Sequence, residues 1–146
     1  AGVSNWQILK ELVDFVRSSS RVIPVFGSGD AFSPEDCKRM IETTDCDAVM
    51  FARGAMGNPF IFKQTKQFLT QGRYDDIEAK ERIEAGFKQL DALLLESKDG
   101  SEEWACREMR KAFCAYSKGI AGGNKLRAKI VSACSRKDYK DIFQFT

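Results

Sequence analysis

The hydrophobic positions of this chain follow one pattern in its first half and another in its second. Two short apolar runs, 22–26 and 48–51, show no polar alternation, which is typical of parallel strands covered on both faces. Apolar residues at helical spacing precede the first run over 6–16 and lie between the runs over 37–41. The order helix, strand, helix, strand predicts an α/β barrel or a doubly wound sheet.

Polar residues mark where these helices begin. Ser4 and Gln7 have the spacing of a capping box before the first helix. Ser33 followed by Pro34 is a strong start for the second, because serine accepts a backbone hydrogen bond and proline fits the first helical position. We therefore expect Ser4 and Ser33 to be the N-caps of the two helices.

After residue 58 the pattern changes to helices alone. Apolar spacing predicts helices over 59–70, 75–98, 101–119 and 124–134, followed by a short helix around 139–143. Asn124 can cap the fourth of these helices. The pattern predicts a small all-α bundle with a domain boundary near Gly72, so the expected domains are an α/β domain over residues 1–72 and the bundle over residues 73–146.

Each predicted strand ends in a turn that suits an anion. The first runs into residues 27–30, which include two glycines, and the second into Ala52, Arg53 and Gly54. Glycine lets the backbone come close to a ligand, and turn amides beside a helix N-terminus favour a phosphate. Arg53 adds a planar cation. Two such turns side by side are the usual phosphate site after the last strands of a TIM barrel. The alternative is that these glycines only make tight turns.

Two strands cannot form a stable parallel sheet by themselves, because each needs neighbours and cover on both faces. Either the chain oligomerises or it is the end of a longer polypeptide, and we expect the second. Its 146 residues suit one domain, or a small domain with a piece of another. No apolar run is long enough to span a bilayer, and no signal peptide precedes the first helix.

The cysteine and histidine contents exclude several kinds of site. The chain has no histidine, so Ser-His-Asp and Cys-His catalysis within it are excluded. Five cysteines are an odd number, and none form a C-x-x-C pair, which disfavours a disulfide framework and a zinc site. A reducing intracellular compartment is the simpler interpretation.

Positive charge gathers toward the C-terminal end. Residues 105–146 hold ten Lys or Arg against three Asp or Glu, which indicates a basic face and a polyanionic partner. Basic charge beside a glycine-rich turn suits contact with an RNA backbone, and the candidate residues are Arg110, Lys111, Lys118, Lys125 and Arg127. Phe113 and Tyr116 are expected in the core rather than as platforms for stacked bases. The alternative is a solvated basic helix without a partner.

Several of these stretches closely resemble tRNA-dihydrouridine synthases. The resemblance rests on Ile23-Pro24-Val25 with Gly29-Asp30, on Ser33-Pro34-Glu35-Asp36, and on Arg53-Gly54-Ala55-Met56-Gly57-Asn58-Pro59 with Ile61-Phe62. Ser117-Lys118-Gly119 followed by Lys125-Leu126-Arg127 also resembles the C-terminal helical domain of that family. The resemblance covers nearly the whole chain and is most specific in its first half.

The family fold is an FMN-containing TIM barrel followed by a helical tRNA-binding domain. The resemblance therefore implies that this chain holds the last two βα units of such a barrel and the bundle after it. It implies reduction of the uridine 5,6 double bond in tRNA with NADPH, through flavin hydride transfer and protonation by a cysteine. By position, the FMN phosphate would be held by Ser28, Gly29, Asp30, Ala52 and Arg53. The family usually has asparagine at position 28 and glycine at position 52.

The family's catalytic cysteine lies earlier in the barrel, and no cysteine of this chain matches its position. We therefore expect a C-terminal fragment that is inactive alone, from a cytoplasmic enzyme that is a monomer when complete. Two alternatives stay open. One is a helical RNA-binding module without enzyme activity, and the other is an FMN-dependent TIM-barrel oxidoreductase that acts on a small molecule.

Overall fold

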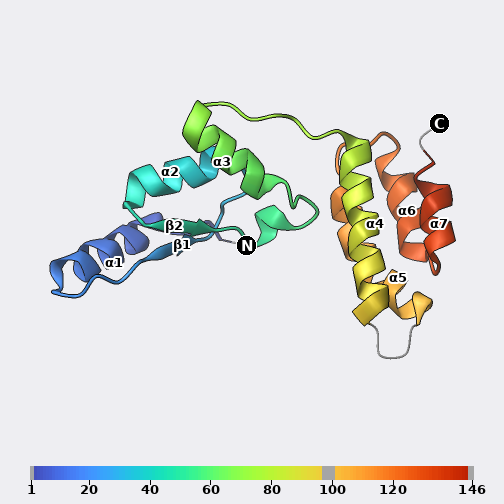
Figure 1. The fold of residues 1–146 in the computed structure, drawn as a ribbon, viewed down its shortest axis with the longest axis horizontal. Helices are drawn as coiled ribbons and strands as arrows, with labels where there is room; N and C mark the ends of the chain where they lie inside the picture. Colours follow the sequence, from blue (N-terminus) through green and yellow to red (C-terminus); the bar gives the residue numbers. More distant parts are fainter. Residues whose placement is uncertain (1, 97–100, 145–146) are drawn as a thin grey trace. The chain divides into compact units, whose positions relative to one another are not determined.

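The computed structural model describes residues 2–96 and 101–144. The chain divides into two compact units, Ala1–Ala55 with Phe60–Asp75, and Met56–Pro59 with Asp76–Thr146. The first unit contains the sheet, and the second is helical (Figure 1). No helix among the described residues is long and apolar enough to cross a membrane.

The first unit alternates helices and strands in the predicted order. Its elements are α1 (Trp6–Ser18), β1 (Phe26–Ser28), α2 (Pro34–Thr44), β2 (Ala48–Met50), the short 3₁₀ helix η1 (Arg53–Ala55) and α3 (Ile61–Gln71). The two strands pair in parallel, with Phe26 opposite Ala48 and Ser28 opposite Met50. Partners in a parallel pair share a face of the sheet, so Phe26 and Met50 lie on one face and Gly27 on the other.

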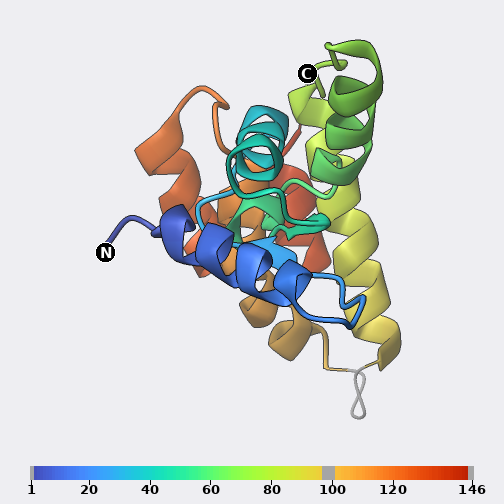
Figure 2. The same ribbon diagram turned by 90° about the vertical axis from the view of Figure 1, so that its left-hand side faces the viewer.

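Helices α1 and α2 cover the Gly27 face. A Cβ at Gly27 would lie 2.6 Å from the Met40 sulfur of α2 and 2.8 Å from a methyl of Leu9 of α1, so the glycine lets both helices approach the strand. Figure 2 shows α1 in dark blue across the front of this unit. On the other face Phe26 is 68% exposed and Met50 is 56% exposed. The prediction of strands covered on both faces is therefore wrong for the described residues.

The first strand also begins at Phe26 rather than at Val22. Pro24 has no N–H to give to a ladder, and the Val25 N–H donates to the Asp47 carboxylate over 2.7 Å instead of to a neighbouring strand. The Asp47 N–H in turn donates to the Val25 carbonyl over 2.9 Å, and the regular ladder follows. Val22 is fully exposed.

One predicted N-cap is confirmed and one is wrong. The Ser33 hydroxyl accepts from the Asp36 N–H over 3.1 Å at the start of α2. At α1 the cap is Asn5, whose side chain accepts from the Gln7 N–H over 3.0 Å. Asparagine caps as well as serine does, and the N–H of Ser4 donates to a residue far along the chain, Asp30.

The second unit is a helical bundle. Its helices are α4 (Ala79–Glu96), α5 (Glu102–Tyr116), α6 (Gly123–Ser132) and α7 (Arg136–Ile142). The helix predicted over 75–98 was expected to end at Lys98, which lies outside the described residues. The N-cap of α6 is Gly122 rather than Asn124. Its φ of 89° lies in the left-handed region, which glycine adopts without strain. Asn124 lies inside the first turn of that helix.

Phe113 is the centre of the bundle core. It is fully buried, and its ring centroid lies 4.2 Å from that of Tyr139 and 5.3 Å from that of Phe87. Tyr116 is 4% exposed, so the prediction that Phe113 and Tyr116 are core residues is confirmed. Helix α7 is held to α4 by Arg136, which donates to both carboxylate oxygens of Asp91 over 2.7 and 3.0 Å.

Gly86 of α4 lies directly against α5, because a Cβ there would be 2.7 Å from the Phe113 ring and 3.1 Å from that of Tyr116. We predict that Gly86→Ala lowers the free energy of unfolding by about 1–3 kcal/mol through overpacking. At an open helical site the same change is usually favourable by about 1 kcal/mol. The control is Gly123→Ala in α6, where no atom lies within 4 Å, and it should cost nothing. Urea unfolding followed by circular dichroism measures both, and an unchanged Gly86→Ala protein would contradict this packing.

Candidate functional site

The carboxyl ends of β1 and β2 meet at a small pocket. All five residues predicted to hold a phosphate line it: Ser28, Gly29, Asp30, Ala52 and Arg53. The lining is completed by Ala31, Phe32 and Met50. The pocket has a volume of about 50 Å³, which suits a single small group rather than a whole cofactor.

Backbone donors at this pocket are free. The N–H groups of Gly29, Asp30, Ala52 and Arg53 donate to no acceptor within residues 2–96 and 101–144. The φ angles of Gly29 and Asp30 are 115° and 52°, in the left-handed region. Successive amides in turns of this kind form concave sites for anions. Each unpaired donor here is a group that an oxyanion can satisfy.

The Arg53 side chain is oriented by two neighbours. Its Nη2 donates to Oδ1 of Asp30 over 3.0 Å, and its guanidinium carbon lies 5.1 Å from the centroid of the Phe32 ring. The side chain remains 62% exposed, so its other N–H groups are accessible. A guanidinium with a fixed plane and unused donors can bind a phosphate through two hydrogen bonds.

Asp30 differs in role from the other four residues. Its Oδ2 accepts from the Ser4 N–H over 2.6 Å, while Oδ1 accepts from Arg53. The Ser4 hydrogen bond, and after it the charge of Arg53, hold the pKa of the Asp30 carboxyl below its ordinary value of 3.8. The carboxylate is therefore ionised at neutral pH and would repel an anion. Its side chain orients Arg53, and only its N–H is available to a ligand.

Three residues that sequence reasoning left out of the site hold its turns in place. A side chain at Gly54 would collide with the carbonyl oxygen of Ala31, so glycine lets the turn after β2 contact the turn after β1. The Trp6 indole N–H donates to the Gly29 carbonyl over 3.0 Å, and Ser4 bonds to Asp30. Gly54 stands inside the predicted turn and could have been found. The contacts of Ser4 and Trp6 span 26 and 23 residues and leave no local signal.

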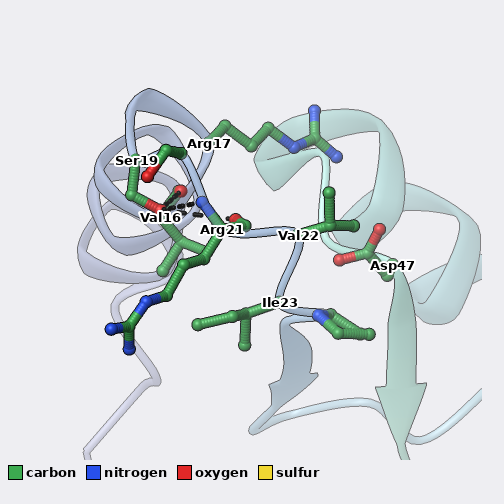
Figure 3. A pocket seen from close by; sticks show the side chains of 9 residues that line it. Val16, Arg17, Ser19, Arg21, Val22, Ile23 and Asp47 are labelled. Carbon is green, nitrogen blue, oxygen red and sulfur yellow. Dashed lines mark hydrogen bonds between the residues drawn. The ribbon is translucent and has the colours of Figure 1, made fainter.

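A larger hollow of about 230 Å³ lies at the opposite ends of the strands (Figure 3). Two of its charged side chains are already engaged: Arg17 pairs with the carboxylate and the carbonyl of Asp45, and Asp47 accepts from the Val25 N–H. Ligands of parallel α/β sheets bind outside the carboxyl ends of the strands. This hollow is therefore not the candidate site.

The residues predicted to contact RNA lie in the helical unit and differ in their surroundings. Arg110 donates to the Ala133 carbonyl from Nε and Nη2, over 3.3 and 3.0 Å, so its guanidinium fastens the segment between α6 and α7. Within the described residues, no hydrogen bond or ion pair engages the side chains of the other four, Lys111, Lys118, Lys125 and Arg127. Lys118 and Arg127 line a pocket of about 260 Å³.

The cysteines do not contribute to the pocket at the strand ends. Cys37, Cys46 and Cys106 are buried, and burial raises the pKa of the Cys106 thiol to about 11. Cys114 and Cys134 belong to the helical unit. In the region of the chain that the structure describes, no three His, Cys, Asp or Glu side chains are grouped so as to hold a metal ion.

Comparison with known proteins agrees with the resemblance seen in the sequence. A family model of dihydrouridine synthases matches residues 2–144. The chain is 44% identical over 144 residues, 99% of its length, to a probable tRNA-dihydrouridine synthase of Treponema pallidum, of which it covers 41%. It is 32% identical over 143 residues, 94% of its length, to a probable tRNA-dihydrouridine synthase of Aquifex aeolicus, of which it covers 40%.

The chain thus spans about two fifths of the length of these two relatives. The matched region contains the two turns of the pocket as well as the helical unit, so the likeness extends through every described element. This chain belongs to the dihydrouridine synthase family.

Proposed function

We propose that the complete protein reduces uridine in tRNA to 5,6-dihydrouridine, with FMN as its bound cofactor and NADPH as the reductant. The relatives from Treponema pallidum and Aquifex aeolicus carry the name tRNA-dihydrouridine synthase, which supports the reaction and the substrate. For this chain, the observation that carries the proposal is the gathering of unpaired backbone N–H groups and Arg53 around one small pocket.

The residues of the pocket fit the phosphate of FMN. The N–H groups of Gly29, Asp30, Ala52 and Arg53 and the guanidinium of Arg53 offer donors, and the Ser28 hydroxyl lines the same pocket. Serine at position 28 and alanine at position 52 depart from the usual family residues, but a hydroxyl still donates and an alanine keeps its backbone N–H. Arg53, held by Asp30, supplies the charge that a phosphate requires.

The open face of the sheet supports the larger architecture. We infer that β1 and β2 are the last two strands of a TIM barrel and that Phe26 and Met50 face the barrel interior. Their exposure, with α1 and α2 on the opposite face, is the arrangement that barrel strands and their outer helices have. The phosphate pocket then lies at the carboxyl ends of the strands, where ligands of such barrels bind.

When bound, FMN supplies the hydride that reduces the uridine double bond. The residues of this chain fix the phosphate end of the cofactor, and the helical unit binds tRNA. We place the proton donor in another region of the complete protein, because no cysteine of this chain matches the position of the family's catalytic cysteine. The thiol of Cys106 is buried and has a raised pKa, which leaves it in its protonated, inaccessible form.

We predict that Arg53→Ala in the complete protein weakens FMN binding about tenfold or more, because a charge-assisted hydrogen bond contributes about 1.5–3 kcal/mol. The control is Arg21→Ala, which removes an arginine from the hollow at the opposite strand ends. Flavin absorbance after gel filtration measures retained FMN. Equal retention by the Arg53→Ala and Arg21→Ala proteins would show that the phosphate lies elsewhere.

Gly54→Ala tests the geometry of the same pocket without changing its charge. The added methyl must displace the turn that carries Ala31, so we predict that FMN occupancy falls while the fold is kept. Gly123→Ala, in the helical unit, is the matched control and should retain FMN as the unmodified protein does. Full occupancy in the Gly54→Ala protein would mean that contact between the two turns is not required.

The reaction itself is tested with the complete FMN-loaded protein, NADPH and a tRNA transcript that carries no modifications. We expect dihydrouridine, which mass spectrometry of the digested nucleosides detects as uridine that has gained two hydrogens. Residues 1–146 alone should give none. No dihydrouridine from the complete protein would refute the proposed function, and product from residues 1–146 would refute only the assignment of the proton donor to another region.

A further inference from the structure

The turn between α5 and α6 gathers cations that have no acidic partner. Lys118 and Arg127 line its pocket, and the guanidinium of a third cation, Arg82 on α4, lies near Gly119 of the turn. Among the described residues, no Asp or Glu lines this pocket. Within residues 2–96 and 101–144, no ion pair or side-chain hydrogen bond engages any of these three side chains. Arg136, by contrast, is neutralised by Asp91 in the same unit.

Arg82 is the unusual member of this group. Its Nε is buried and has no hydrogen-bond partner among the described residues. A buried, unpaired guanidinium nitrogen costs free energy, because it has left water without gaining a hydrogen-bond partner. The terminal Nη2 lies 4.0 Å from the position that a Cβ of Gly119 would occupy. Arg82 therefore holds a partly desolvated positive charge against the turn, with its end directed at Gly119.

Gly119 leaves the turn open at that point. Its φ is 81°, in the left-handed region, and it has no side chain to cover the backbone. The N–H groups of Ser117, Lys118 and Ile120 donate within α5 and the turn over 2.9, 3.2 and 3.1 Å. The N–H of Gly119 donates to no acceptor in the described chain. Gly119, Lys118 and Arg127 thus line a pocket of about 260 Å³, and the Arg82 guanidinium lies close to Gly119.

We propose that this turn binds one phosphate of the RNA backbone, and that Arg82 donates hydrogen bonds to it beside the free N–H of Gly119. A phosphate has several acceptor oxygens, so it can satisfy the Gly119 N–H and the terminal N–H groups of Arg82 together. Lys118 and Arg127 then flank the same group. The inference rests on the proposed function, because it takes tRNA as the source of the phosphate.

No local sequence signal points to Arg82. It lies on α4, outside the basic stretch 105–146, and only the packing of α4 against α5 brings it to the turn at Gly119. Arg110, which the basic stretch does suggest, donates to the Ala133 carbonyl. Position within the basic stretch is thus a weaker guide to contact with RNA than whether the guanidinium is already hydrogen-bonded within the fold.

The test is tRNA binding by the complete, FMN-loaded protein, measured by filter binding over a series of salt concentrations. We expect Arg82→Gln to weaken binding about tenfold and to reduce the slope of log K against log salt by about one, as for the loss of one phosphate contact. Arg82→Lys should recover some of the affinity. The control is Lys88→Gln, which removes one charge from α4 outside the pocket and should change affinity by less than about twofold.

A structural role for Arg82 would give a different result. If Arg82→Gln weakens binding with an unchanged salt slope and a lower melting temperature, the residue supports the fold and the inference is wrong. Binding equal to that of the unmodified protein also overturns it, while FMN retention and dihydrouridine formation then still support the proposed function. Failure of the unmodified protein to bind tRNA would overturn both.

Discussion

The candidate site depends on two turns that meet backbone to backbone at the edge of the sheet. Gly54 has no side chain to hold it away from the carbonyl of Ala31, so the ends of β1 and β2 close on one small pocket. That contact brings Arg53 within hydrogen-bond distance of Asp30, and Asp30 in turn holds the N–H of Ser4. The lack of a side chain at Gly54 therefore helps to position the Arg53 guanidinium in the candidate site.

Charged side chains in this protein orient one another more than they stabilise the fold. The pairs Arg53–Asp30 and Arg136–Asp91 are only partly buried, and solvent-exposed pairs contribute about 0–1 kcal/mol. Their value is geometric, since a paired guanidinium has a fixed plane. Among the described residues, Arg82, Lys118 and Arg127 have no such partner, so their charge is available to a ligand. Paired cations thus hold segments of the fold in place, whereas these three unpaired cations can interact with a ligand.

Local signals in the sequence predicted the order of the elements well and their ends only in part, and long-range contacts could not be read from it. Ser33 with Pro34 indicated the start of α2, the helical spacing placed Phe113 in the core, and the glycine-rich turns indicated the pocket. The family resemblance rested on contiguous motifs and is confirmed. The hydrogen bond from the Val25 N–H to the Asp47 carboxylate, after which β1 begins at Phe26, joins distant segments of the chain and has no local sequence signal.

The sheet of the described residues has consequences for handling this chain by itself. Each of its two strands is paired along one edge only, and the side chains of Phe26 and Met50 are exposed on one face of the sheet. An unpaired, apolar strand edge is a template onto which an extended segment of another molecule can add. For the isolated chain, association between molecules is therefore expected to involve the same strands whose ends form the candidate pocket, and Met50 belongs both to the exposed face and to the lining of that pocket.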